Sequence, residues 1–239
     1  MAIGAHPDDV ELGCAGTLYN HVRKGQQVAI VDLTEGELGS RGTVETRYAE
    51  AAAASRVLGV AHRHNLQMED GFFQHNRENV LKLVQVIRLH QPEVILANAP
   101  SDRHPDHGRA STLIRDAAFL SGLIKIETSW EGQPQAAWRP KRVFHYIQDR
   151  FLEPSFIVDV TESMEAKMES VKCYGTQFYS QDDDGAPVTY ISTEKFLDKV
   201  KERAALLGKR IGATYGEGFI SEANLGIADL DKLLYPEIA

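Results

Sequence analysis

The sequence contains only two cysteines, Cys14 and Cys173, which lie far apart in a chain of 239 residues. A disulfide framework is therefore excluded, and two free thiols in a reducing cytoplasm are expected. Cys14 follows Asp8 by six residues and so lies near the polar cluster described below. A single thiolate with no second cysteine nearby is weak evidence for a metal ligand, so we expect Cys14 to be an ordinary thiol.

Long apolar runs and blocks of positive charge are also lacking. No stretch of about 18 apolar residues occurs, as a membrane span would require. The first residues lack the charged and apolar regions of a signal peptide. The formal net charge is -8, which argues against nucleic acid or an anionic membrane as a partner. These absences predict a cytoplasmic protein and leave a small-molecule substrate open.

The residues that are present predict an α/β protein. Hydrophobic residues make up 43% and charged residues 25% of the chain, as in ordinary globular domains. The apolar run Met1–Ala5 predicts a buried strand, Leu12–Lys24 a helix closed by Gly25, and Gln27–Leu33 a second strand. Strand, helix and strand in this order are typical of a right-handed parallel βαβ unit.

The same alternation continues along the chain. Further strands are expected at His62–Leu66, Glu93–Ala97, Val143–Ile147 and Phe156–Val160. Further helices are expected from the cap Thr43 to Gly59, over Arg77–His90 and Gly108–Leu120, from the cap Thr161 to about Tyr174, and from Thr193 to about Ile211, with a loop at Gln181–Gly185. We therefore predict a Rossmann-like three-layer fold with a mainly parallel sheet. One domain, 1–239, is expected, with a core of about 1–150 and a smaller C-terminal α+β portion of about 151–239.

Two clusters of histidine and aspartate each follow an expected strand, and no other segment concentrates these residues in the same way. His6-Pro7-Asp8-Asp9 follows the first strand, and His104-Pro105-Asp106-His107 follows Glu93–Ala97. Ligands of open α/β sheets bind in the crevice outside the carboxyl ends of the strands. We therefore expect the two clusters to meet at that edge.

The residue types in these clusters suit a catalytic metal. His6, Asp9 and one histidine of the second cluster would supply two imidazoles and a carboxylate, which with open positions is typical of catalytic zinc. A zinc-bound water ionises near neutral pH. Asp8 is the candidate general base, because the base must not itself be a ligand. The remaining histidine could stabilise an oxyanion or protonate a leaving group, with Asp106 available to orient it. His107 is favoured as the ligand by position only.

Other interpretations remain at this point. Two histidines and a carboxylate also form the iron site of non-haem oxygenases, but those sites lie in all-β barrels. Arg47, early in an expected helix, is either an exposed surface residue or an anchor for an anionic or hydroxyl-rich substrate. The glycine-rich segment Thr34–Gly42, which includes Ser40 and Arg41, is expected to form part of the crevice wall. A non-catalytic sugar- or nucleotide-binding module is the alternative of another class, although binding alone does not require such a metal centre.

At these residues the sequence resembles the PIG-L/LmbE superfamily of zinc-dependent de-N-acetylases. The motifs are A-H-P-D-D-V-E-L-G at Ala5–Gly13, T-E-G-E-L-G-S-R-G at Thr34–Gly42 and R-H-P-D-H at Arg103–His107. The resemblance implies that the zinc ligands are His6, Asp9 and His107. It also implies that Asp8 is the general base, that His104 stabilises the tetrahedral intermediate, and that Arg47 lies in the substrate pocket.

Further segments resemble the branch that makes bacillithiol. They are Asn65-Leu66, Asp70–Phe73, Gly122–Lys125, Tyr190–Ser192 and Glu217–Phe219. This resemblance implies hydrolysis of N-acetylglucosaminyl-malate to acetate and a free amine, with Arg41, Arg47 or Arg103 binding the malate carboxylates. Related enzymes cleave thiol–sugar conjugates, mycothiol precursors or chito-oligosaccharides.

The resemblance carries three further expectations. Fe²⁺ or another divalent metal could occupy the same ligands as Zn²⁺. The protein is expected to be a homo-oligomer, a trimer or a hexamer. Only five residues precede His6, fewer than such proteins usually carry. This predicts a short first strand or a start further upstream.

Overall fold

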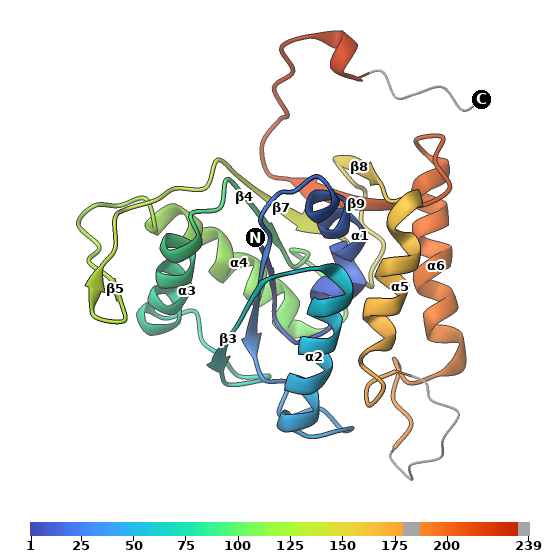
Figure 1. The fold of residues 1–239 in the computed structure, drawn as a ribbon, viewed down its shortest axis with the longest axis horizontal. Helices are drawn as coiled ribbons and strands as arrows, with labels where there is room; N and C mark the ends of the chain where they lie inside the picture. The colour runs from blue at the N-terminus through green and yellow to red at the C-terminus, as the bar shows by residue number, and fades with distance from the viewer. Residues whose placement is uncertain (179–186, 234–239) are drawn as a thin grey trace.

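A seven-stranded sheet forms the centre of the computed structural model, which describes residues 1–178 and 187–233 (Figure 1). The strand order is β3-β2-β1-β4-β7-β9-β8. The strands are β1 (Ala2–Gly4), β2 (Ala29–Thr34), β3 (His62–Met68), β4 (Val94–Ala97), β7 (Arg142–Tyr146), β8 (Phe156–Asp159) and β9 (Gly216–Ser221), and β5 (Ser129–Trp130) and β6 (Gln133–Pro134) form a separate small hairpin. The first five strands of this order pair in parallel, and β9 runs antiparallel to both β7 and β8. The predicted α/β fold with a mainly parallel sheet is confirmed.

Helices cover both faces of the sheet and complete three layers. The helices are α1 (Asp9–Arg23), α2 (Val44–Leu58), α3 (Arg77–His90), α4 (Pro105–Leu120), α5 (Met164–Lys172) and α6 (Glu194–Lys209), with short 3₁₀ turns η1 (Thr161–Ser163) and η2 (Leu230–Leu233). Figure 1 shows α3 and α4 on one side of the sheet and α1, α2 and α5 on the other, with α6 beside α5. Along the described chain, no helix combines the length and the apolar character needed to cross a bilayer.

Alternation along the central strands explains why both faces hold helices. Ile3, Val31 and Ile95 pack in one apolar cluster with the inner sides of α3 and α4. Their neighbours Ile30 and Leu96 turn to the other face and pack in a second cluster with α1. Because both faces are buried, these strands appear in the sequence as continuous apolar runs.

The strand order reverses between β1 and β4. The chain proceeds outward from β1 through β2 to β3, then returns to place β4 on the other side of β1. Open α/β sheets bind ligands at such a switch point. The two polar clusters follow the two strands that flank it.

Several helix boundaries differ from the sequence-based expectation. The expected helix at Leu12 begins at Asp9, and the expected helix at Gly108 begins at Pro105. Acidic residues occupy the first turn of α1, and a proline occupies the first turn of α4, both favoured positions. The last residues of both motifs therefore lie on helical first turns, which hold their side chains more rigidly than loops would.

The C-terminal portion differs more. Its strands β8 and β9 join the central sheet, with β9 placed between β7 and β8. Sequence reasoning missed β9, because Gly216 and Gly218 interrupt its apolar pattern. Thr161 begins a 3₁₀ turn and α5 starts only at Met164. The expected loop at Gln181–Gly185 lies outside the described residues.

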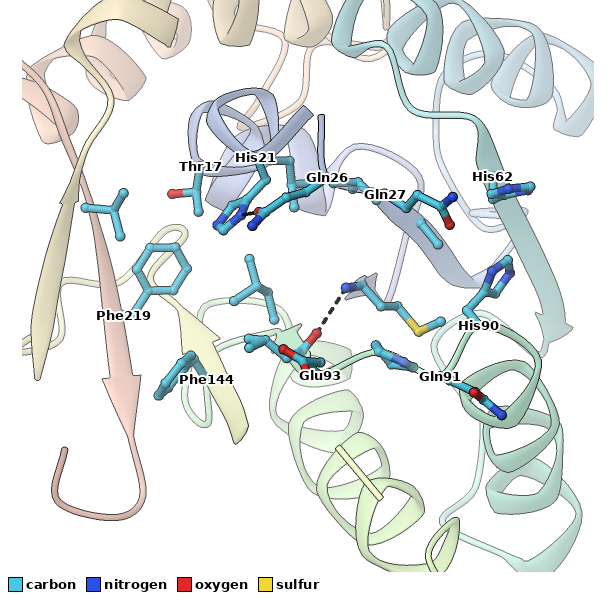
Figure 2. A pocket seen from close by; sticks show the side chains of 18 of the residues that line it. Thr17, His21, Gln26, Gln27, His62, His90, Gln91, Glu93, Phe144 and Phe219 are labelled. Carbon is cyan, nitrogen blue, oxygen red and sulfur yellow. Dashed lines mark hydrogen bonds between the residues drawn. The ribbon is translucent and has the colours of Figure 1, made fainter. Parts of the chain in front are cut away.

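A cavity of about 630 Å³ lies at the amino ends of the strands, away from both clusters (Figure 2). Phe144 and Phe219 face it from one side and His62 and His90 from the other. Its lining is mainly apolar, and it contains none of the residues of the two clusters. Open α/β sheets bind their ligands at the opposite edge, where the two clusters lie. The functional site is therefore expected there and not in this cavity.

Candidate active site

A cavity of about 260 Å³ lies at the carboxyl ends of the central strands, where the two clusters meet. Its lining includes nine of the residues that the sequence singled out: His6, Asp8, Asp9, Ser40, Arg41, Arg47, Arg103, His104 and His107. Residues about a hundred positions apart are thus brought together. Asp106 lies just behind this lining, fully buried against His6.

His6, Asp9 and His107 form the centre of the site. The Nε2 atom of His107 lies 3.1 Å from Oδ1 of Asp9, and Nδ1 of His6 lies 3.5 Å from Oδ2 of the same carboxylate. The two imidazole centroids are 5.7 Å apart. Nitrogens of His6, His104 and His107 also lie within 4.8 Å of one another. These donors are the imidazole and carboxylate types that zinc and iron bind.

Each of the two central imidazoles contacts a carboxylate through its other nitrogen. Nε2 of His6 lies 3.0 Å from Asp70 and 3.3 Å from Asp106, and Nδ1 of His107 lies 2.7 Å from Asp102. Metal-binding histidines almost always have such a partner, which fixes the ring and its tautomer. The nitrogens that face Asp9 are therefore the ones left for a cation.

The electrostatics of the site also favour a cation. Burial alone would lower the pKa of His107, but the charge of Asp9 and the bond to Asp102 raise it to about 9. Burial also lowers the pKa of His6, but its hydrogen bonds to Asp106 and Asp70 raise it, and the resulting pKa is well above the usual value. The carboxylates thus favour the protonated, positively charged form of both rings. A divalent cation would supply that charge with the rings neutral, so the donor set fits a metal.

Asp8 lies beside this centre with an unusual backbone. It is the N-cap of α1 with φ 117°, a left-handed conformation that side-chain-bearing residues rarely adopt. Burial raises the pKa of Asp8 to about 7, and the positive charge of Arg47, 4.0 Å away, opposes this rise. A carboxyl group with a pKa in this range suits proton transfer near neutral pH.

His104 is held by backbone rather than by a carboxylate. Its Nδ1 accepts from the backbone N–H of Asp106 at 3.3 Å, so a neutral ring carries its proton on Nε2. Burial and the neighbouring His6 lower its pKa. The carboxylate of Asp106 was expected to orient this histidine, but it lies against His6 and accepts from the backbone of Gly71 instead.

The three arginines of the cavity differ in burial and in the hydrogen bonds that their side chains make to the protein. Arg47 is buried, which excludes the exposed-surface interpretation, and its guanidinium donates to Pro7 and Gln177. Arg41 donates to the backbone of Thr176 and Pro187. Arg103 contacts Asp149 at 3.3 Å and lies over the ring of Tyr190, with about half of its side chain exposed.

Sequence reasoning missed the residues that hold the centre in place. Asn98, at the end of β4, donates to Asp9 and accepts from the backbone of Ala5, so it joins the two strands of the switch point. Gln148 donates to the other oxygen of Asp9 at 2.6 Å. Asp102 immediately precedes the R-H-P-D-H motif. In the sequence, only its position shortly after a strand end indicates that it could contact the site.

The fold and the site together define an α/β protein with a candidate divalent-metal centre at its switch point. The family model described as "PIG-L: GlcNAc-PI de-N-acetylase" matches residues 1–118, which include both histidine–aspartate clusters. The conserved protein TT1542 from Thermus thermophilus is similar over the whole fold, with 35% identity, a TM-score of 0.83 and coverage of 95% of this chain and 96% of that one. The chain belongs to the PIG-L superfamily.

Two deacetylases of diacetylchitobiose are also similar to this chain. The diacetylchitobiose deacetylase of Thermococcus kodakarensis is 28% identical, with coverage of 91% of this chain and 80% of that protein. The structure of N,N'-diacetylchitobiose deacetylase from Pyrococcus horikoshii is 27% identical with a TM-score of 0.77, and the match covers 91% of this chain and 81% of that one.

Proposed function

We propose that the protein is a metal-dependent hydrolase that removes the acetyl group from an N-acetylglucosamine conjugate. The observation that carries this proposal is the pair of imidazoles of His6 and His107, each with a carboxylate partner on one nitrogen and Asp9 facing the other. Asp8 remains beside them as a carboxylate outside this set. Relatives named as deacetylases of diacetylchitobiose and of a GlcNAc-inositol support the reaction class.

His6, Asp9 and His107 would hold the cation, for which we propose Zn²⁺, with Fe²⁺ or another divalent metal as the alternative. When bound, such a cation polarises an amide carbonyl and lowers the pKa of water. Asp8 would accept a proton from the attacking water as an oxygen–carbon bond forms at the acetyl carbon. The N–H of His104 would stabilise the oxyanion. As the carbon–nitrogen bond breaks, Asp8 or His104 would donate a proton to the amine, and acetate would leave.

For the substrate we propose N-acetylglucosaminyl-malate, an intermediate of bacillithiol synthesis. Among the three arginines of the cavity, Arg103 supports an anionic group best, because much of its side chain is exposed at the rim. Arg41 and Arg47 already donate to the protein, so we propose that they shape the pocket wall together with Ser40. The alternatives are a different GlcNAc-containing substrate and an amide bond in a thiol–sugar conjugate.

The test is amine release from N-acetylglucosaminyl-malate, diacetylchitobiose and N-acetylglucosamine, with and without a chelator. We expect chelator-sensitive release, fastest with the malate conjugate. Fast release from diacetylchitobiose alone would overturn the proposed malate substrate but would support the proposed deacetylation. A purified protein with neither bound metal nor activity on any acetamide would favour a non-catalytic sugar-binding module.

We also propose a cytoplasmic homo-oligomer, a trimer or a hexamer, in line with the sequence resemblance. Light scattering coupled to size-exclusion chromatography would measure the assembly directly.

A further inference from the structure

Gln148 is a buried residue of the active-site cavity that neither cluster contains. It lies two positions after the end of β7, is 5% exposed, and shares the cavity lining with Asp9 and His107. Its Nε2 donates to Oδ1 of Asp9 at 2.6 Å. Because a carboxylate only accepts, the nitrogen end of the amide must face Asp9, and the Oε1 end must face away from it.

The Oε1 atom of Gln148 is buried and has no hydrogen-bond partner among the described residues. A buried carbonyl oxygen that has lost its water costs free energy until a donor completes it. Because Gln148 lines the reaction cavity, an acceptor without a partner in its side chain favours a substrate or a water that can donate a hydrogen.

The carboxylates of Asp9 and Asp70 in this cavity already have partners. Asp9 accepts from the backbone of His6, from Asn98 and from Gln148. Asp70 contacts the ring of His6 and accepts from the backbone of Leu38.

Two further acceptors of the cavity also have other roles. The oxygen of Gln177 accepts from Arg47. The carboxylate of Asp8 is the base of the proposed reaction.

A secondary acetamide needs partners at both ends. Its carbonyl oxygen needs donors or a cation, and its N–H needs an acceptor. We infer that Oε1 of Gln148 accepts the N–H of the scissile acetamide, and so selects amides with a hydrogen on nitrogen. This inference rests on the proposed function and adds a specificity-determining contact to it.

The experiment compares two matched substrates. One is the 2-acetamido sugar conjugate, and the other carries a 2-O-acetyl ester at the same position and therefore lacks the N–H. Gln148→Met keeps the length of the side chain and removes its acceptor. We expect the amide-to-ester ratio of kcat/KM, measured at saturating metal, to fall about ten- to a hundredfold in this variant. Because methionine also removes the donor to Asp9, any loss of metal affinity or of Tm affects the two substrates alike and leaves their ratio unchanged. Gln85→Met, on the outer helix α3, is the matched control and should leave the ratio as in the wild type.

Each outcome separates this inference from its alternatives. Equal losses on amide and ester would show that Gln148 only positions Asp9 and would overturn the inference. An unchanged ratio would overturn it as well. A wild-type protein without activity on the acetamide would overturn the proposed function itself. If Gln148→Met folds poorly, Gln148→Leu, which also removes the acceptor and fills a similar volume, provides the same comparison.

Discussion

The backbone of Asp8 stores strain at the residue proposed to do the chemistry. Its φ of 117° is a conformation that glycine adopts without cost and other residues adopt at about 1–3 kcal/mol. The strand β1 ends four residues earlier and α1 begins at the next residue, so the turn leaves little freedom. The left-handed conformation of Asp8 places its carboxylate beside the imidazoles. The strained conformation persists because β1 and α1 fix both ends of the turn.

We therefore expect Asp8→Gly to be more stable than Asp8→Ala by about 1 kcal/mol, because only glycine relieves the strain. Both variants should lose about 10²–10⁴-fold in kcat, since neither carries the base, while both retain the metal. Urea unfolding and metal analysis measure these effects. Equal stability of the two variants would show that the turn is not strained, and normal turnover in either would show that Asp8 is not the base.

A second prediction at this scale concerns the carboxylate behind His107. Asp102→Asn keeps the shape of the side chain but weakens its bond to Nδ1 of His107, which lies 2.7 Å away. Loss of such a partner typically costs about 10–100-fold in metal affinity, and we expect a loss in that range by competition titration with a chelator.

The chain offers a matched control for this variant. Asp116 contacts His75 at 3.0 Å on the surface, so Asp116→Asn removes a similar pair far from the centre. It should leave the metal affinity unchanged. Equal losses in the two variants would mean that the effect is general electrostatics and not ring orientation.

At the residue scale, the sequence was informative where the functional residues are neighbours in the chain. His6, Asp8 and Asp9 stand together, as do His104 and His107, and each group follows a recognisable strand. The partners of these residues could not be inferred. Gln148 reaches Asp9 across 139 positions, and only the folded sheet brings the two together.

At the scale of elements, α1 contains a kink at Cys14, and side chains of other elements bind the backbone groups that the kink leaves unpaired. Cys14 has non-helical backbone angles within it, so backbone groups on either side lose their helical partners. Glu217 of β9 accepts from the freed N–H groups of Gly16 and Thr17, at 3.0 and 2.7 Å. Lys167 of α5 donates to the carbonyl of Leu12 at 2.9 Å and pairs with Glu217 at 2.6 Å. The break thus sets the direction of the first turn of α1, which carries Asp9.

We expect Glu217→Gln to lower the free energy of unfolding by about 3 kcal/mol, because it leaves Lys167 as a buried charge without a counterion. Adding Lys167→Met should recover part of this loss, since the double variant buries no charge. Chemical unfolding of the single and double variants gives the coupling energy. Strictly additive losses would show that the two side chains stabilise α1 independently.

Strong apolar periodicity and good caps made most elements predictable. The caps Thr43 and Gly59 of α2 are confirmed, with a capping box at one end and a left-handed glycine at the other. The misses have physical reasons. The two-residue strands β5 and β6 are too short for any periodicity, and β9 carries two glycines. The first strand is indeed short.

At the scale of the whole molecule, three histidines lie close together where β3 begins and α3 ends. Nε2 of His64 on β3 lies 2.7 Å from Nε2 of His90 at the end of α3, and His62 lies beside them. Burial, together with the neighbouring His64 and His62, lowers the pKa of His90 to about 4. In the unfolded chain a histidine has a pKa of about 6.5.

Between about pH 6.5 and 4 the unfolded chain therefore binds more protons at this position than the folded one. The stability contribution of His90 is present above about pH 6.5 and is lost as the pH falls toward 4. Allowing for partial exposure, we expect a loss of about 1 kcal/mol from this residue. His90→Gln should show a correspondingly smaller decline in unfolding free energy over this range. Parallel curves for the wild type and the variant would contradict the prediction.

The position of β9 has a consequence for synthesis on the ribosome. Residues 216–221 are among the last of the described chain to emerge. Their place, however, is inside the sheet, between β8 and β7, which begin 60 and 74 residues earlier in the chain. Until they emerge, the nascent chain presents the unpaired edge of β7 and a lysine at position 167 with no counter-charge. The growing polypeptide therefore passes through a stage in which an exposed strand edge can pair with another chain, and chaperones that shield such edges should associate with it at that stage.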